Sequence, residues 1–119
     1  MTDPRESGLL LDPKFDANGL LTAVVVDVAD GAVLMVGHMN HEALQVTQKT
    51  GKVTFFSRSR QRLWTKGESS GHFLHLDELR IDCDQDALLV IARPDGPTCH
   101  TGERSCFYRR VTPTGLERL

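Results

Sequence analysis

Runs of apolar residues separated by turn residues predict several short strands and one helix. Residues 20–28 and 32–36 are two runs rich in valine and leucine, and Asp30-Gly31 stands between them. Asp-Gly between two apolar runs is a strong signal for a β-hairpin. The first part of the chain therefore predicts an antiparallel pair of strands.

A helix is predicted next, over residues 41–50. Asn40 precedes it as a favoured N-cap, and Glu42 in the first turn complements the helix dipole. Gly51 stands where helices often end in the left-handed conformation. We expect one main helix at about residues 40–50.

Strand patterns return after this helix. Residues 52–57 have strand character, and in residues 73–81 the apolar positions change parity near 77–78, which predicts a β-bulge there. Residues 87–92 form the most hydrophobic run and suit a strand buried on both faces. Residues 106–111 are a possible last strand.

These elements predict a compact single α+β domain, made mostly of antiparallel strands with one main helix. A chain of 119 residues has room for one such domain. We expect the domain to span residues 15–111, between a flexible N-terminal segment at 1–14 and a frayed C-terminal tail at 112–119. The pattern does not predict the order of the strands.

Charge and composition narrow the function classes. The 14 basic and 16 acidic residues give a net charge of −2, without the general basic field expected of a nucleic-acid-binding protein. No apolar run has the length of a signal segment or a membrane span, so we expect a cytoplasmic protein. The three cysteines are an odd number, and we expect their thiols to be free to bind metal.

Three carboxylates at Asp82, Asp84 and Asp86 form the first candidate metal site. If this segment is extended, all three point to one face and Cys83 points to the other. Clustered aspartates suit Mg²⁺ or Ca²⁺. The alternative is a solvated acidic turn.

The thiols of Cys83, Cys99 and Cys106 form the second candidate site, and they suit zinc. Three protein ligands with a fourth position for water are typical of a catalytic zinc. His100 as a fourth ligand would instead close the site as a structural one. A third possibility combines Cys83 of one subunit with Cys99 and Cys106 of another.

The segment 57–72 is basic and rich in serine and glycine, and it is a candidate for binding phosphate through guanidinium groups, hydroxyls and backbone amides. It contains the only tryptophan, Trp64, which could stack on a base. The alternative is a solvated loop with Trp64 packed into the core. The candidate substrate-binding residues in this segment are Arg58, Arg60, Trp64, Lys66 and Ser70.

Taken together, these residues resemble phosphoribosyl-AMP cyclohydrolase, an enzyme family of histidine biosynthesis. The resemblance covers about residues 15–108, in order along the chain. Its most specific parts are the aspartate–cysteine and cysteine–histidine motifs. The matching segments are Phe15-Asp16, Asn18-Gly19-Leu20, Met39-Asn40, Glu42-Ala43-Leu44, Ser57-Arg58-Ser59-Arg60, Leu63-Trp64, Lys66-Gly67-Glu68, Ser70-Gly71-His72, Asp82-Cys83-Asp84, Asp86-Ala87-Leu88-Leu89, Gly96-Pro97, Cys99-His100-Thr101-Gly102 and Ser105-Cys106-Phe107.

The resemblance implies a cytoplasmic, intertwined homodimer that opens the adenine ring of 1-(5-phosphoribosyl)-AMP with water. It implies zinc at the three cysteines, with Cys83 contributed across the dimer, and Mg²⁺ at the three aspartates. Gly37-His38 and Thr22 depart from the family pattern, outside the metal motifs. Many relatives carry a fused pyrophosphohydrolase domain, for which this chain is too short.

A mechanism follows as a hypothesis. A zinc-activated water attacks C6 of the purine, and the C6–N1 bond then breaks. His100 is the first choice for the proton-transferring group, and His72 is the second. Arg104 joins Arg58, Arg60 and Lys66 as a candidate for binding phosphate.

Two other functions are consistent with parts of the pattern. One is a zinc-dependent nucleotide deaminase, although the chain lacks both the His-x-Glu and the Pro-Cys-x-x-Cys elements of that class. The other is a small zinc-stabilised RNA-binding module that uses the basic segment, which the acidic net charge and the few aromatic residues disfavour.

Overall fold

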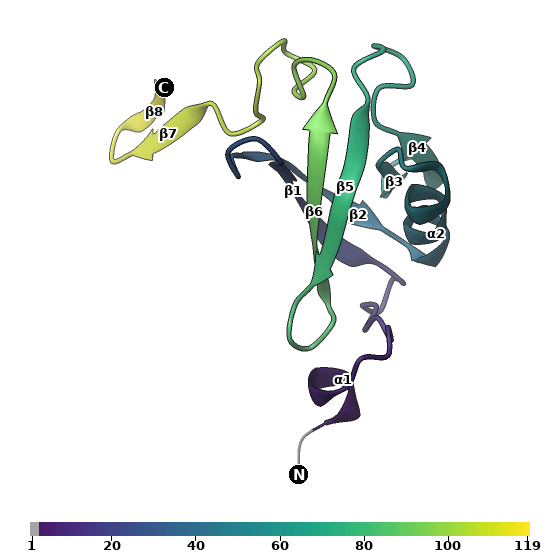
Figure 1. Cartoon of the computed structure of the whole chain (residues 1–119). Helices are drawn as coiled ribbons and strands as arrows, with labels where there is room; N and C mark the ends of the chain where they lie inside the picture. The colour runs from purple at the N-terminus through teal and green to yellow at the C-terminus, as the bar shows by residue number, and fades with distance from the viewer. Residues whose placement is uncertain (1–2) are drawn as a thin grey trace.

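A four-stranded sheet forms the centre of the molecule in a computed structural model that describes residues 3–119 (Figure 1). Its strands lie in the order β2-β1-β6-β5. The β1–β6 pair is parallel, and the other two pairs are antiparallel. The elements are α1 (Pro4–Ser7), β1 (Leu21–Asp27), β2 (Val33–Met39), α2 (His41–Thr50), β3 (Thr54–Ser57), β4 (Arg62–Thr65), β5 (Leu74–Ile81), β6 (Ala87–Pro94), β7 (Arg109–Thr112) and β8 (Gly115–Arg118).

The structure confirms the α+β fold class, the first hairpin and the main helix. β1 and β2 pair antiparallel around the Asp30-Gly31 turn. Asn40 caps α2, because its Oδ1 accepts the N–H of Ala43 at 2.8 Å. Gly51 ends α2 in the left-handed conformation, with φ of 74°.

One face of the sheet, the inner face, is covered by α2 and by the β3–β4 hairpin, as Figure 1 shows. The core lies between these layers. The bulge predicted near residues 77–78 is present between Leu76 and Glu78, and it keeps Leu79 and Ile81 packed against this core. The largest fully buried side chains are Phe55, Leu21, Leu34, Met39 and Leu74.

The opposite face of the sheet, here called the outer face, is apolar but incompletely covered in one chain. The prediction of burial on both faces for residues 87–92 is therefore wrong for the single chain. Positions 88, 90 and 92 are buried, whereas positions 87, 89 and 91 are only half-buried. The apolar residues of the outer face are Val24, Val26, Val33, Val36, Leu89 and Ile91.

The C-terminal residues form a hairpin, here called the arm, that lies apart from the sheet (Figure 1). The frayed tail expected at 112–119 is wrong, because β8 pairs with β7 across a two-residue turn. The strand predicted at 106–111 corresponds to β7, which begins at Arg109 rather than at Cys106, whose N–H donates to the Leu34 carbonyl. Val111 of the arm is 83% exposed.

Two further elements were not predicted from the sequence. The polar segment after residue 57 contains a strand, β4, which pairs with β3. The N-terminal segment, expected to be flexible, contains α1 and is anchored by the buried Gln85. The Gln85 side chain accepts the N–H of Asp12 and donates to the carbonyl oxygens of Arg5 and Leu10. None of the helices within residues 3–119 combines the length and the apolar character needed to cross a membrane.

Candidate active site

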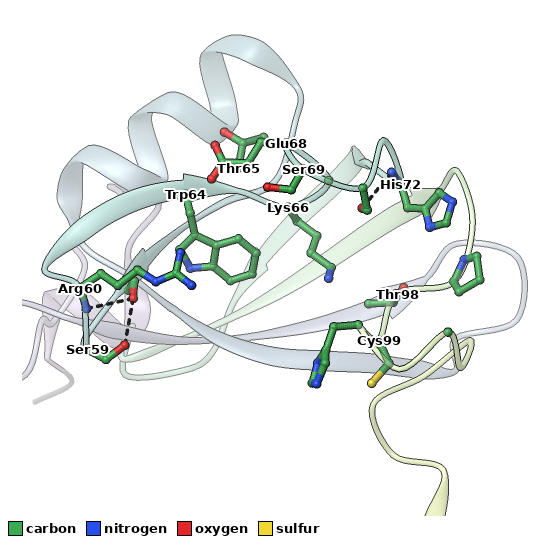
Figure 2. Close-up of a pocket in the computed structure, with 16 residues that line it drawn as sticks. Ser59, Arg60, Trp64, Thr65, Lys66, Glu68, Ser69, His72, Thr98 and Cys99 are labelled. Carbon is green, nitrogen blue, oxygen red and sulfur yellow. Dashed lines mark hydrogen bonds between the residues drawn. The ribbon is translucent and has the colours of Figure 1, made fainter.

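A cavity of about 570 Å³ opens at the end of the sheet where β6 finishes. Its volume lies in the range of small-molecule sites. Figure 2 shows that the side chains in its wall come from segments far apart in the sequence. These segments are the tip of the β3–β4 hairpin, residues 64–70 with His72, and the loop at 97–102.

The cavity wall combines positive charge with an aromatic surface. Arg60, Trp64 and Lys66 all line it. The Trp64 indole packs against Phe55, with ring centroids 5.1 Å apart, yet it stays partly exposed to the cavity. Phe55 in turn packs on Gly37, where a Cβ would lie 2.6 Å from a ring carbon. Both predicted roles of Trp64, core packing and exposure to a ligand, are therefore compatible.

Tight turns place Ser70 and His72 in the same wall. Gly67 has φ of +96°, and a Cβ there would lie 2.6 Å from the carbonyl carbon of His72, so only glycine fits this approach. A Cβ at Gly96 would lie 2.9 Å from the imidazole of His72. The N–H of His72 also donates to Ser70 Oγ at 3.2 Å. Gly67 thus lies against the backbone of His72 and Gly96 against its exposed imidazole ring.

The thiols of Cys99 and Cys106 meet at the edge of this cavity. Cys99 is buried and lines the cavity, and its Sγ accepts the hydroxyl of Thr101 at 3.0 Å. This hydrogen bond lowers the pKa of Cys99. The pKa of Cys106 is raised, first by burial and then by the neighbouring Cys99 thiol. Two adjacent thiols, one of them with a lowered pKa, are suitable ligands for zinc.

Cys83 does not join these two thiols in one chain. It lies in the turn between β5 and β6, at the other end of the sheet from the 97–102 loop (Figure 1). The eight residues of β6 separate the two ends, and they span roughly 25 Å. A zinc ion needs sulfur atoms about 2.3 Å from its centre. One chain therefore brings together two of the three predicted zinc ligands.

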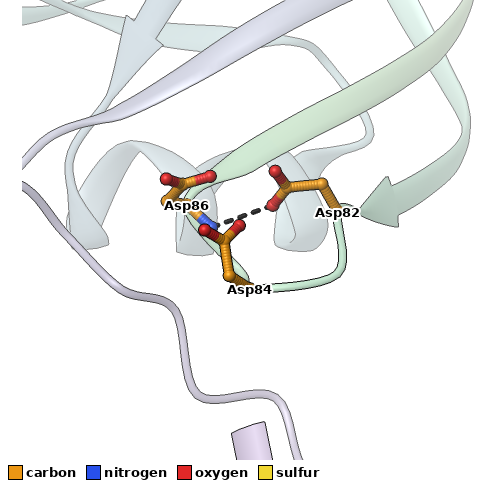
Figure 3. Close-up of side chains that lie close together, drawn as sticks. All are labelled: Asp82, Asp84 and Asp86. Atoms are coloured by element: carbon orange, nitrogen blue, oxygen red, sulfur yellow. Dashed lines mark hydrogen bonds between the residues drawn. The ribbon is translucent and has the colours of Figure 1, made fainter. Parts of the chain in front are cut away.

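The three aspartates do lie together, as Figure 3 shows. Their nearest carboxylate oxygens all fall within 4.8 Å of one another. The condition of an extended segment is not met, because the chain turns here and Gln85 takes a left-handed φ of 60°. Asp82 Oδ1 stabilises this turn by accepting the N–H groups of Asp86 and Ala87. The turn, and not a strand face, gathers the carboxylates.

The carboxylates of this cluster change one another's ionisation. The pKa of Asp86 is raised to about 6, first by side-chain hydrogen bonds with Asp82 and then Asp84, and then by burial and the negative charges of the same two neighbours. Burial would raise the pKa of Asp82, but hydrogen bonds from Ala87 and Asp86 lower it overall. Oxygen ligands that repel one another are typical of a site for a hard divalent cation.

Comparison with known proteins identifies the family. A family model described as phosphoribosyl-AMP cyclohydrolase matches residues 35–108. A protein of that name from Rhizorhabdus wittichii is 60% identical over 97% of this chain and 93% of its own length. A protein of the same name from Sphingopyxis alaskensis is 56% identical over 97% of this chain and 91% of its own length. Another from Brucella canis is 57% identical over 92% of this chain and 81% of its own length. The chain belongs to the phosphoribosyl-AMP cyclohydrolase family. It is accordingly an enzyme of the hydrolase class.

The structure of this family member brings six of the eight predicted catalytic and substrate-binding residues into one cavity, together with the metal-ligand candidate Cys99. His100 and His72 line it with Arg60, Lys66 and Cys99, and Trp64 and Ser70 belong to the same wall. The other two predicted substrate-binding residues lie elsewhere. Arg58 lines a second, smaller cavity, and Arg104 bridges Asp27 and Asp30 at 3.0 and 2.8 Å. Phosphate binding by Arg104 stays a prediction.

The two departures from the cyclohydrolase family pattern are neighbours in space. Thr22 on β1 pairs directly with His38 on β2. Burial, together with the charge of Arg58, lowers the pKa of His38. Gly37 is explained by the close approach of Phe55. Thr22 and His38 therefore lie together on the outer face, whereas Gly37 faces inward against Phe55, and none of the three lines the cavity.

Two residues of the site were missed from the sequence. Thr98 lines the cavity, and its Oγ1 is the one buried side-chain nitrogen or oxygen without a hydrogen-bond partner within residues 3–119. Thr101 was seen as part of a motif but not as the hydrogen-bond donor to Cys99. No spacing signal marks Thr98, because its role depends on burial beside the cavity.

Proposed function

We propose that this chain catalyses the hydrolytic opening of the adenine ring of 1-(5-phosphoribosyl)-AMP in L-histidine biosynthesis. Water adds at C6, the C6–N1 bond breaks, and the product is the formimino-aminoimidazole carboxamide ribotide. The oxygen of water stays on C6 as the carboxamide, and its protons end on nitrogen, so no atom is lost. The observation that carries this proposal is the 60% identity to a named relative over nearly the full length of both chains.

The cavity supports this proposal through its chemistry. The Trp64 indole offers a flat surface for the purine, and Lys66 lies with its Nζ 5.8 Å from that ring. Arg60 and Lys66 offer positive charge for a phosphate group. A nucleotide is the class of ligand that needs both a stacking surface and cations.

Zinc is the proposed catalytic metal, held by Cys99 and Cys106 and by Cys83 of a second copy. The adjacent thiols at the cavity edge fit that metal. When bound, zinc supplies a water that is activated at neutral pH. His100 is the proposed group that takes a proton from the attacking water, with His72 as the second choice. Both line the cavity, and one of them must deliver a proton to N1 as the bond breaks.

Mg²⁺ is the proposed ligand of Asp82, Asp84 and Asp86. The clustered carboxylates and the raised pKa of Asp86 support a cation that offsets their repulsion. Mg²⁺ there would supply positive charge for a phosphate or hydroxyl group of the substrate. Cys83 belongs to the same turn, so a partner that brings Cys83 to the cavity also brings these aspartates.

A homodimer is therefore part of the proposal, and two surfaces support it. On the outer face, Val33 is 42% exposed and Val36 is 43% exposed. Leu89 and Ile91 on the same face are half-buried. The arm exposes apolar residues, and within residues 3–119 one ion pair, Arg118 with Glu103, joins it to the body. An isolated two-stranded hairpin is marginal in water. A second copy could cover both surfaces.

Light scattering of the purified chain tests the dimer. We expect the mass of two chains, and we expect removal of residues 109–119 to shift the protein toward the monomer. Arg110→Ala, which changes the exposed surface of the arm without shortening it, is the control. A truncated protein that stays fully dimeric would exclude the arm from the interface.

Turnover of the zinc-bound protein on phosphoribosyl-AMP, supplied with Mg²⁺, tests the reaction. We expect the absorbance of the opened imidazole product to appear, and the product mass to equal that of substrate plus water. Release of ammonia would favour a deaminase instead. His100→Ala that retains zinc and near-normal turnover would contradict the proton-transfer role, whereas loss of zinc from it would favour a closed four-ligand site.

A further inference from the structure

A second cavity of about 350 Å³ lies on the other side of the β3–β4 hairpin tip. It is formed where the turn before β1 and the N-cap of α2 meet that tip. No role assigned above uses it. The residues that line it are Asn18, Leu20, Asn40, Phe56, Arg58 and Gln61.

Its lining combines one guanidinium and three carboxamides with an apolar floor. Arg58 forms no ion pair within residues 3–119. Asn40 uses its Oδ1 to cap α2, which leaves the two N–H donors of its amide free to face a ligand. Asn18 makes no side-chain hydrogen bond within the described chain, since only its backbone N–H is used. These are neutral and cationic donors, with no carboxylate among the lining residues.

One acidic group lies near Arg58. Backbone hydrogen bonds from Leu20 and Asn18, with a smaller contribution from the Arg58 charge, lower the pKa of Asp16. Asp16 Oδ1 accepts both of these N–H groups, at 2.9 and 2.8 Å. The carboxylate is therefore engaged in its own turn. It does not form a salt bridge that would occupy Arg58.

The hairpin tip divides its side chains between the two cavities. Ser59 and Arg60 line the first cavity, whereas Arg58 and Gln61 line the second. A local hydrogen bond holds the tip, in which the N–H of Arg60 donates to Ser57 Oγ at 3.2 Å. The chain turns at Gln61, which has a left-handed φ of 52°. A ligand that crosses this tip would meet one arginine on each side.

The proposed substrate has two phosphoribosyl groups, one on N1 and one on N9 of the same purine. With the purine beside Trp64, the first cavity offers Arg60 and Lys66 to one of the two phosphates. We infer that the second cavity binds the other phosphoribosyl group, with Arg58 on its phosphate and the amides of Asn18 and Asn40 on phosphate or ribose oxygens. This inference rests on the proposed function and assigns Arg58 and Arg60 to different phosphates.

Titration calorimetry with two partial ligands tests it on the zinc-bound protein. AMP carries the N9-linked group, and ribose 5-phosphate stands for the N1-linked group. We expect Arg58→Ala to weaken the binding of one of these ligands by about 10- to 100-fold, the range of a lost charge-assisted hydrogen bond, and to leave the other within about twofold. The affected ligand then shows which phosphoribosyl group the cavity holds.

Two variants sharpen the result. Asn18→Ala should weaken the same ligand several-fold without a change in thermal unfolding, because its side chain makes no bond within the described chain. Arg62→Ala removes an equal charge from the same hairpin at a position that lines neither cavity, and it should change neither affinity. In turnover, Arg58→Ala should raise KM and leave kcat nearly unchanged.

Three outcomes would overturn the inference. They are unchanged affinities in Arg58→Ala, an equal loss for both ligands, and a wild-type protein that binds neither. Because calorimetry does not depend on turnover, a protein that binds these ligands but fails to open the ring would refute the proposed reaction and leave the second cavity as a phosphoribosyl site.

Discussion

The two ends of the central sheet carry the two candidate metal sites, and they are built in different ways. The carboxylate end is one turn, in which five consecutive residues, 82–86, gather three aspartates within 4.8 Å. The cavity end joins the 57–72 segment to the 97–106 loop, and the N–H of Cys106 donates to the carbonyl of Leu34 on a third segment. Each end holds part of the proposed set of metal ligands.

The difference means that the candidate metal ligands are divided along the length of one strand. β6 places the ends roughly 25 Å apart, so Cys83 and the aspartates cannot reach Cys99 in the same chain. A two-fold symmetric pair of chains would bring the carboxylate end of each to the cavity end of the other. Each dimer would then hold two complete sites.

Loss of a cavity-end thiol should have the largest effect. Cys106→Ser should abolish zinc binding and lower kcat by at least about 1,000-fold, because the activated water is lost. Zinc content by atomic absorption and turnover measure this together. Ser105→Ala, next to it, should keep the zinc. A Cys106→Ser protein with full zinc and full activity would remove this thiol from the site.

Complementation between the two ends should have the next largest effect. Cys83→Ser and Cys99→Ser should each be inactive alone, because every site then lacks one thiol. Unfolded and refolded together, they should recover about a quarter of wild-type activity, because mixed dimers contain one intact site. Mixing that restores nothing, while mixed dimers are seen by mass spectrometry, would contradict the shared site.

Asp86 should give the carboxylate end a pH-dependent effect on stability. The pKa of Asp86 is raised to about 6 from an ordinary 3.8, so between these values the folded chain keeps a proton that the unfolded chain has released. Stability of the metal-free protein should therefore fall as pH rises through this window. The pKa of Asp82 is lowered, so Asp82 changes the stability of the fold only below pH 3.8 and not in this range.

Thermal unfolding from pH 4 to 6.5 measures this effect as a difference between wild type and Asp86→Asn. The pKa of His38 is lowered, so its contribution makes stability rise with pH, opposite to that of Asp86. Both proteins contain His38, and subtracting one curve from the other removes its contribution. Mg²⁺ should abolish the fall in the wild type. If the unfolding temperatures of the two proteins change with pH in parallel, the pKa of Asp86 is not raised.

Thr98 should show the smallest effect. Thr98→Val keeps the shape of the side chain and removes a buried hydroxyl that has no partner within residues 3–119. It should raise the free energy of unfolding by up to about 1 kcal/mol and lower kcat/KM a few-fold, because a ligand loses a hydrogen bond in the cavity wall. Thr98→Ser keeps the hydroxyl and should restore activity. A valine variant with full activity would show that the hydroxyl has no ligand partner.

The local elements of this chain were predictable because their determinants lie within a few residues. Asn40 and Gly51 bracket α2, and Asp30-Gly31 closes the first hairpin, since capping and turn chemistry act over one or two turns of chain. β4 was missed because it has only four residues inside a polar segment, and its pairing with β3 decides its conformation. β8 was missed for the same reason.

The sequence by itself determined the family, the candidate ligands and the aspartate cluster, because residue types and short spacings carry that information. Tertiary structure alone decided that Cys83 lies at the other end of the sheet from Cys99, that Thr98 is buried beside the cavity, and that Arg58 and Arg60 line different cavities. Strand order and the direction of β6 set these distances. They follow from long-range packing, which no local pattern encodes.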